Sequence, residues 1–98
     1  MNAEILLQKD AVLTVANKLF VYTDTRYWQG LLDEVFTDKV YFDMTSLAGG
    51  EPTTLFATTI TAIWDEGLKP LEAVHHQTGN FDITIDGDTA TVNCYGIA

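Results

Sequence analysis

Hydrophobic residues recur at helical spacing along the first part of the chain. Between residues 3 and about 22 the apolar side chains fall three or four positions apart, with charged and polar residues between them, which predicts an amphipathic helix. A second apolar stripe with this spacing covers residues 28–36 and predicts a second helix. Because Asp24 and Thr25 offer side-chain oxygens just before this stripe, either residue could be the N-cap of the second helix.

The middle of the chain changes from an alternating pattern to a helical one. Over residues 39–46 apolar and polar side chains alternate, and this period of two predicts a strand with one buried face. After the Gly49-Gly50 turn, Pro52 stands where a first-turn proline would begin a third helix. Apolar residues then recur at helical spacing until Gly67, which is expected to close this helix, and Pro70 prevents its continuation.

The last part of the chain predicts a β-hairpin. Residues 73–85 and 89–97 have the pattern of two strands, and the Asp86-Gly87-Asp88 segment between them is typical of a tight hairpin turn. The predicted order is helix, helix, strand, helix, strand, strand. This order indicates an α+β fold in which three helices pack on an antiparallel sheet.

The length of the chain limits how it can be organised. With 98 residues, of which 47% are hydrophobic, residues 1–98 can build one core and are expected to form a single domain. A domain this short has a thin margin of stability. We therefore expect self-association, in the form of a homodimer.

The charge balance argues against several classes of partner. Fourteen acidic residues against five Lys and Arg give a formal net charge of −9, which repels nucleic-acid backbones and anionic membrane surfaces. The apolar runs are far shorter than the ~20 residues that cross a bilayer. Cys94 is the single cysteine, and the chain does not open with a signal-like segment. A cytoplasmic location is therefore expected.

Two sequence blocks resemble a known family. The first block comprises residues 22–28, Leu31-Leu32 and residues 36–40, and the second comprises residues 74–80 and 85–90. In order and spacing they resemble SnoaL-like proteins of the nuclear transport factor 2-like superfamily, which includes ketosteroid isomerase-like and scytalone dehydratase-like enzymes. The resemblance covers nearly the whole chain, and it implies a cone-shaped, cystatin-like fold in which a curved antiparallel sheet encloses an apolar pocket.

The resemblance also implies a longer sheet than this chain can supply. Family members usually continue for a few dozen residues with long strands that complete the sheet, whereas this chain stops at Ala98. We therefore expect a C-terminally truncated or reduced form of the domain.

The same resemblance implies roles for one aspartate and one histidine. In the scytalone dehydratase branch a helix-end aspartate and a strand histidine act together on an enclosed substrate, and the matching residues here are Asp24 and His76. A carboxylate in an apolar pocket and an imidazole can move protons beside a carbonyl. Asp24 is interpreted as a base or water-orienting group and His76 as its acid–base partner. The alternatives are a helix cap for Asp24 and an exposed or interfacial position for His76.

Strand parity leaves the choice between the two histidines open. Strict alternation places His75 on the same face as Phe81, which favours His75 as the residue that faces the pocket. A β-bulge at Gly79-Asn80 would reverse the facing upstream of it and favour His76, which the family resemblance also supports.

Further residues are candidates for binding a substrate. They are Tyr22, Tyr27, Trp28, Met44, Phe56, Ile60, Trp64 and His75. Aromatic and aliphatic side chains in these positions can equally be core packing. Arg26, the only arginine, could clamp an anionic group of a substrate or pair with a surface carboxylate.

Two functions agree with these residues. The first is a cofactor-independent acid–base lyase, isomerase or cyclase that acts on a small apolar carbonyl or hydroxyl compound in an enclosed pocket. Adjacent histidines without helical spacing or a cysteine partner are a poor zinc signal, and a glycine-rich phosphate loop is absent, so no metal or cofactor is expected. The alternative is a non-catalytic module of the same family that binds a small ligand or dimerises.

Overall fold

Residues 3–35 are mainly helical in the computed structural model, as predicted. The structure describes residues 3–44 and 49–97. Helix α1 (Ala3–Asp24) is followed by a short helix α2 (Trp28–Gly30), which continues as one turn of π-helix, η1 (Leu31–Val35). The predicted N-cap is wrong, because Asp24 still belongs to α1 and α2 begins after Tyr27 without a side-chain cap.

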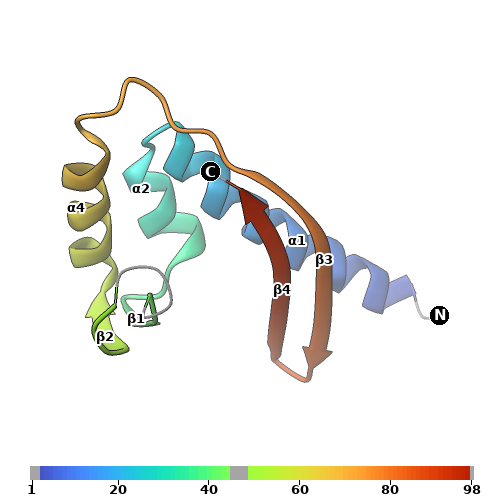
Figure 1. The fold of residues 1–98 in the computed structure, drawn as a ribbon. Helices are drawn as coiled ribbons and strands as arrows, with labels where there is room; N and C mark the ends of the chain where they lie inside the picture. Colours follow the sequence, from blue (N-terminus) through green and yellow to red (C-terminus); the bar gives the residue numbers. More distant parts are fainter. Residues whose placement is uncertain (1–2, 45–48, 98) are drawn as a thin grey trace.

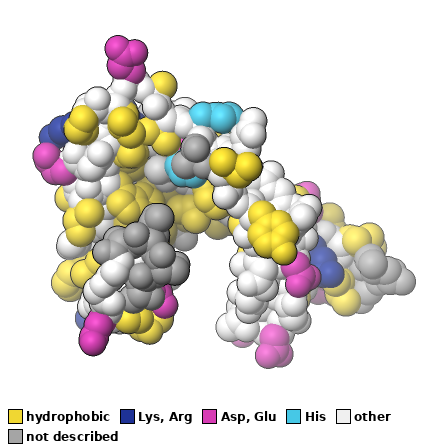
Figure 2. Space-filling model, in the orientation of Figure 1, with side chains coloured by type: hydrophobic (Ala, Val, Ile, Leu, Met, Phe, Trp, Pro, Cys, Tyr) yellow, Lys and Arg dark blue, Asp and Glu magenta, His cyan; other side chains and the backbone are white. Residues whose placement is uncertain are grey.

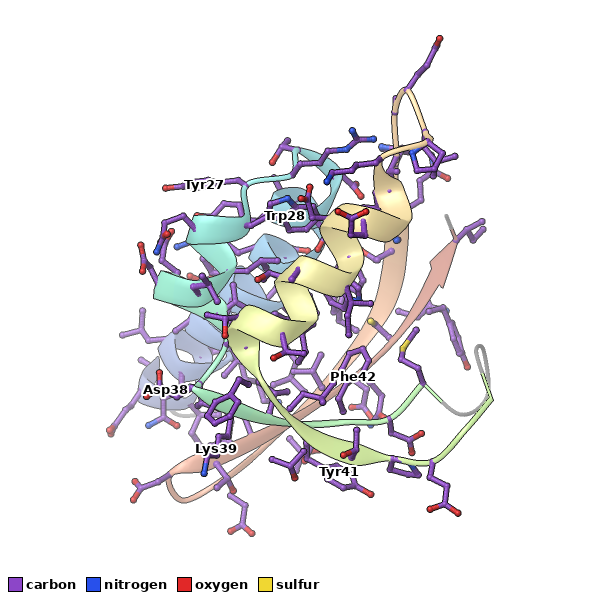
Figure 3. All side chains as sticks on the ribbon, turned by 90° about the vertical axis from the view of Figure 1, so that its left-hand side faces the viewer. Tyr27, Trp28, Asp38, Lys39, Tyr41 and Phe42 are labelled. Atoms are coloured by element: carbon purple, nitrogen blue, oxygen red, sulfur yellow. The ribbon has the colours of Figure 1, made fainter. Side chains whose placement is uncertain are left out.

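The region after η1 forms a short hairpin. Strand β1 (Lys39–Phe42) pairs antiparallel with β2 (Thr53–Phe56), and Val40 lies opposite Leu55. On β1, Phe42 points inward and Tyr41 points out to solvent (Figure 3). The last part of the predicted strand, residues 45 and 46, lies outside the described residues.

The predicted start of the third helix at Pro52 is wrong. Residues 53–56 form β2, and helix α4 spans Ala57–Leu68. The β-branched Thr53 and Thr54 favour an extended backbone, and pairing with β1 supplies backbone hydrogen bonds that these residues would otherwise find in a helix. The helix also runs one residue past Gly67, which was expected to close it.

The C-terminal hairpin contains the predicted turn and, of the two alternatives for β3, the one with a bulge. Strand β3 (Gln77–Asp86) pairs antiparallel with β4 (Thr89–Ile97), and Gly87 in the turn has a φ of 58°. Pairing is irregular between Gly79 and Asp82, where Asn80 has a φ of 54°. The extra residue is a β-bulge, and β3 begins at Gln77, four residues later than the pattern indicated.

The described strands form two separate two-stranded sheets where one continuous sheet was expected, although the α+β class is confirmed. The curved β3–β4 hairpin lies along α1, and α2, η1, α4 and the β1–β2 hairpin form the other side of the molecule (Figure 1). The most buried large side chains, Leu31 and Ile60, lie on that other side. A hollow separates the two sides, and hydrophobic side chains cover its floor (Figure 2). In the described part of the chain, no helix is both long and apolar enough to cross a membrane.

Candidate functional site

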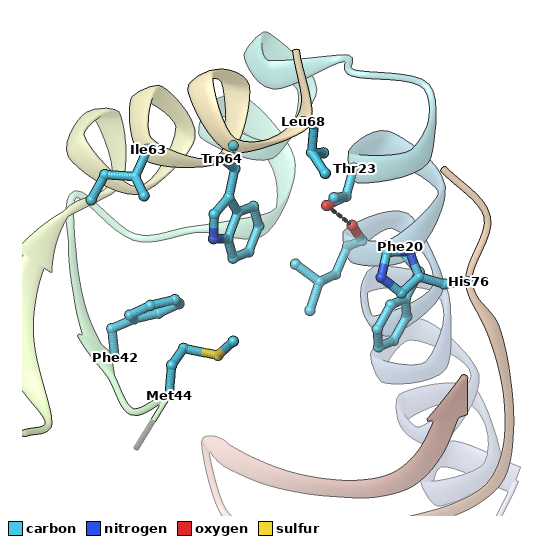
Figure 4. Close-up of a pocket in the computed structure, with 10 residues that line it drawn as sticks. Phe20, Thr23, Phe42, Met44, Ile63, Trp64, Leu68 and His76 are labelled. Atoms are coloured by element: carbon cyan, nitrogen blue, oxygen red, sulfur yellow. Dashed lines mark hydrogen bonds between the residues drawn. The ribbon is translucent and has the colours of Figure 1, made fainter. Parts of the chain in front are cut away.

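The hollow contains a pocket with a volume of about 560 Å³. Its wall comes from the end of α1, from β1 and the residues after it, from α4, and from the residue before β3. The lining residues are Leu19, Phe20, Thr23, Phe42, Met44, Ile63, Trp64, Gly67, Leu68 and His76. Phe42, Met44 and Trp64 lie on one side of it, and Phe20 and His76 lie across from them (Figure 4).

Asp24 and His76 are in direct contact at the edge of this pocket. The backbone N–H of His76 donates to Asp24 Oδ2 at 2.8 Å, and His76 Nδ1 forms a short hydrogen bond with Asp24 Oδ1. Both side chains are largely shielded from solvent, with exposed fractions of 16% for Asp24 and 26% for His76. The last residue of α1 and the residue that precedes β3 therefore meet through both oxygens of one carboxylate.

This contact keeps Asp24 ionised. Burial alone would raise the pKa of the Asp24 carboxyl, but the side-chain and backbone hydrogen bonds from His76 outweigh burial and hold this pKa below its ordinary value. An ionised Asp24 can only accept hydrogen bonds. Nδ1 of His76 therefore carries the proton of the short bond, and Nε2 is the ring nitrogen left available to a bound molecule.

The surroundings of His76 in the pocket are apolar and aromatic. The ring of Phe20 packs against the imidazole with 5.7 Å between the ring centroids. The Thr23 hydroxyl donates a hydrogen bond to the backbone carbonyl of Leu19 at 2.6 Å (Figure 4). On the far wall, Trp64 packs against Phe42 with 6.0 Å between the ring centroids. Among the described residues that line the pocket, the imidazole is thus the one titratable side chain.

The β-bulge decides which histidine faces the pocket. Downstream of Asn80 the half-buried residues of β3 are Phe81 and every second residue after it up to residue 85. Upstream of the bulge residues 79 and 80, Thr78 and His76 are half-buried, and the residues before each of them are exposed. His75 is exposed and does not line the pocket. The bulge therefore reverses the alternation, and His76 is the pocket residue.

Of the other predicted binding residues, Met44 and Trp64 line the pocket with His76, and the rest lie elsewhere. Ile60 is 1% exposed and belongs to the core, and Phe56 is exposed beneath the ammonium group of Lys39. Trp28 donates its indole Nε1–H to Asp65 Oδ1 on α4 at 3.0 Å.

Tyr22 and Tyr27 are not among the residues that line the pocket. The Tyr22 hydroxyl donates to Glu34 at 2.8 Å, and Glu34 also accepts a hydrogen bond from Lys18. Tyr27 is half-exposed and packs edge-on against the ring of Tyr22. These tyrosines are not available to polarise a carbonyl in the pocket.

The sequence reasoning missed the contribution of α1 to the pocket wall. Leu19, Phe20 and Thr23 occupy one face of the last turns of α1, at the i, i+1 and i+4 positions that lead towards Asp24. This spacing would have identified them once Asp24 was placed at the end of α1. Within residues 3–44 and 49–97, no group of three His, Cys, Asp or Glu side chains could hold a metal ion.

Comparison with known proteins identifies the class of domain. Residues 4–98 match the family model described as the SnoaL-like domain, so the chain belongs to the SnoaL-like family, and the predicted resemblance is confirmed. No curated protein sequence matches the chain.

A solved structure supports the same fold. The Kfla4162 protein from Kribbella flavida superimposes with a TM-score of 0.88 at 23% sequence identity, over 97% of this chain and 63% of that protein. At this identity the likeness concerns the fold. The chain thus spans somewhat less than two thirds of the length of the protein it matches.

Proposed function

We propose that this chain carries the acid–base site of a SnoaL-like lyase, isomerase or cyclase, and that the pocket binds a small, neutral, largely apolar carbonyl or hydroxyl compound. The observation that carries the proposal is the pairing of both Asp24 oxygens with His76 at the edge of an apolar pocket. Histidine is the side chain best suited to exchange protons near neutral pH.

Each member of the pair has a separate role. Asp24 stays ionised, holds His76 in the tautomer with the proton on Nδ1, and stabilises the imidazolium when it forms. Nε2 of His76 accepts a proton from a carbon beside the substrate carbonyl. The imidazolium then returns that proton to another carbon of the substrate in an isomerisation, or to a departing hydroxyl group in a dehydration.

The lining of the pocket supports a neutral substrate. The described part of its wall is apolar apart from His76 and the Thr23 hydroxyl, and this hydroxyl donates its hydrogen bond to the carbonyl of Leu19. An anionic group would lose its hydration there without gaining a Lys or Arg partner, because neither residue type is among the lining residues that the structure describes. The three rings of Phe20, Phe42 and Trp64 favour a flat or cyclic compound.

A second candidate is a non-catalytic binding or dimerisation module in the cytoplasm, and exposed apolar residues on β4 favour it. Tyr95 and Ile97 are 74% and 71% exposed, and β4 pairs only with β3 among the described strands. A free edge with apolar side chains is suited to pairing with another strand, such as that of a second copy in a homodimer. Such a dimer is also compatible with the catalytic proposal.

Proton exchange on a simple ketone tests the catalytic proposal. The probe is 2-indanone in deuterated buffer, and NMR follows the loss of the protons beside its carbonyl. His76→Gln is expected to slow the catalysed exchange by about 100- to 10,000-fold, the range of general acid–base catalysis. His75→Gln, a matched change at an exposed residue, should leave the rate within about twofold. If the wild type exchanges these protons no faster than His76→Gln does, the catalytic proposal is contradicted and the non-catalytic binding module is the remaining candidate.

A further inference from the structure

Arg26 has an unusual backbone conformation for its residue type. Its φ is 58°, in the left-handed region, and it follows the end of α1. The N–H of Arg26 donates to the carbonyl of Thr23 at 3.1 Å, and the N–H of Tyr27 donates to that of Tyr22 at 2.7 Å. This is the Schellman arrangement, in which glycine or asparagine normally takes the left-handed position because a larger side chain is strained there. Something in the folded protein therefore offsets the strain at Arg26.

The side chain of Arg26 makes two hydrogen bonds to a distant part of the chain. Its Nη2 donates to the backbone carbonyl of Leu68 at 3.0 Å and to that of Leu71 at 2.6 Å. Leu68 is the last residue of α4, where the helix dipole places partial negative charge. The guanidinium group thus binds two backbone carbonyl oxygens, and among the described residues no surface carboxylate pairs with it.

These bonds join the same parts of the chain as the Asp24–His76 contact. Arg26 comes two residues after Asp24, Leu71 comes five residues before His76, and Leu68 itself lines the pocket. The same two segments, the end of α1 and the connection from α4 to β3, are therefore tied together twice. Because only four residues separate Leu71 from His76, a shift of Leu71 away from Arg26 would also displace the imidazole of His76.

We propose that Arg26 is a positioning residue for the Asp24–His76 pair. It fixes the path of the connection between α4 and β3, so that the backbone and imidazole of His76 both reach Asp24 and the rim at Leu68 stays in place. This inference rests on the proposed function. The strained left-handed conformation persists because the guanidinium group must reach both carbonyls.

The test uses substitutions that suit a left-handed backbone. Arg26→Gly and Arg26→Asn both remove the two hydrogen bonds and lessen the strain, so the variants are expected to fold. The matched structural control is Trp28→Phe, which removes the other hydrogen bond from this region to α4, the one from Trp28 to Asp65. Nitrogen-15 NMR of the imidazole reports which ring nitrogen of His76 carries the proton.

The outcomes separate this inference from the proposed function. We expect the Nδ1–H signature of His76 in the wild type and in Trp28→Phe, and a mixture of tautomers in Asp24→Asn and in both Arg26 variants. The rate constant of 2-indanone exchange should fall at least tenfold in the Arg26 variants. If the Arg26 variants keep the wild-type tautomer and rate while Asp24→Asn loses both, Arg26 only connects the ends of α1 and α4, and the inference is overturned. If Asp24→Asn also keeps them, the proposed function fails.

Discussion

Asp24 accepts hydrogen bonds from both the backbone N–H and the imidazole of His76, a residue 52 positions further along the chain. The backbone bond fixes where the connection to β3 passes, and the imidazole bond fixes how the ring is turned. One carboxylate therefore joins α1 to the start of the C-terminal hairpin and also sets the tautomer of the pocket histidine. A structural and a chemical role coincide in the same contact.

The lowered pKa of Asp24 predicts how stability depends on pH. Because the folded-state pKa lies below the ordinary value of 3.8, the ionised carboxylate stabilises the fold above that pH, and this contribution is lost as the pH falls through the folded pKa. Asp24→Asn should lower the free energy of unfolding at about pH 7 by roughly 1–3 kcal/mol, the range for hydrogen bonds to a charged group. Urea unfolding at about pH 7 and about pH 3 measures the change.

The control for this prediction is Asp82→Asn, at an exposed position on β3. The wild type and Asp82→Asn should lose stability together on acidification, whereas Asp24→Asn should lose less because it has no carboxylate there to protonate. Equal acid sensitivity in Asp24→Asn and the wild type contradicts the role assigned to the carboxylate.

The close packing at Gly30 predicts a large effect from one added methyl group. A Cβ built at Gly30 would lie 2.6 Å from Cδ2 of Tyr27 and 2.7 Å from Cδ2 of Tyr22, so both rings would have to move. Gly30→Ala should lower the free energy of unfolding by about 1–3 kcal/mol, as overpacking does elsewhere. Gly67→Ala is the matched control, since nothing lies within 4 Å of its Cβ and alanine favours the helix. Equal urea midpoints for the two variants would show that the ring packing is looser than described.

The bulge at Asn80 makes a prediction about His76. Asn80→Gly keeps a residue that tolerates the φ of 54°, so stability should change by less than about 1 kcal/mol. Asn80→Val places a β-branched side chain in the left-handed region and should lower the free energy of unfolding by about 1–2 kcal/mol or more. If the bulge turns His76 into the pocket, the valine variant also loses the Nδ1–H signature in NMR. If Asn80→Val keeps both the wild-type stability and the Nδ1–H signal of His76, the bulge does not determine the orientation of His76.

Local patterns predicted most of the fold because the energies that select it are local. The first helices and the Asp-Gly turn follow from apolar spacing and from glycine at a positive φ. The prediction that a helix begins at Pro52 was wrong because a proline is as acceptable before an edge strand as in a first helical turn. Only the pairing of β2 with β1 decides between the two structures. That pairing joins residues 39–42 to residues 53–56, and a short window of sequence does not contain both segments.

The candidate site was predictable in part for the same reason. Asp24 and His76 were expected from motif resemblance, and Gly79-Asn80 gave the local signal of the bulge that turns His76 inward. The position of Asp24 at the end of α1 and the reach of Arg26 to Leu71 depend on tertiary contacts. The sequence could not supply them, since an arginine beside a helix end is usually a surface residue.

The two tryptophans provide the last prediction, because Trp64 belongs to α4 whereas Trp28 reaches α4 from α2. Trp64 lines the pocket, whereas Trp28 uses its indole N–H to bond Asp65. The same change, Trp to Phe, should therefore have different effects at the two positions. Trp64→Phe removes ring area that faces a bound molecule and should raise the dissociation constant for 2-indanone by about three- to tenfold, equivalent to roughly 0.6–1.4 kcal/mol. Trp28→Phe should leave that constant within about twofold and lower the free energy of unfolding by about 1–2 kcal/mol through the lost hydrogen bond.

NMR titration with 2-indanone measures the dissociation constant of each tryptophan variant, and urea unfolding measures its free energy of unfolding. Weakened binding in Trp28→Phe that equals the loss in Trp64→Phe would place the ligand outside the pocket described.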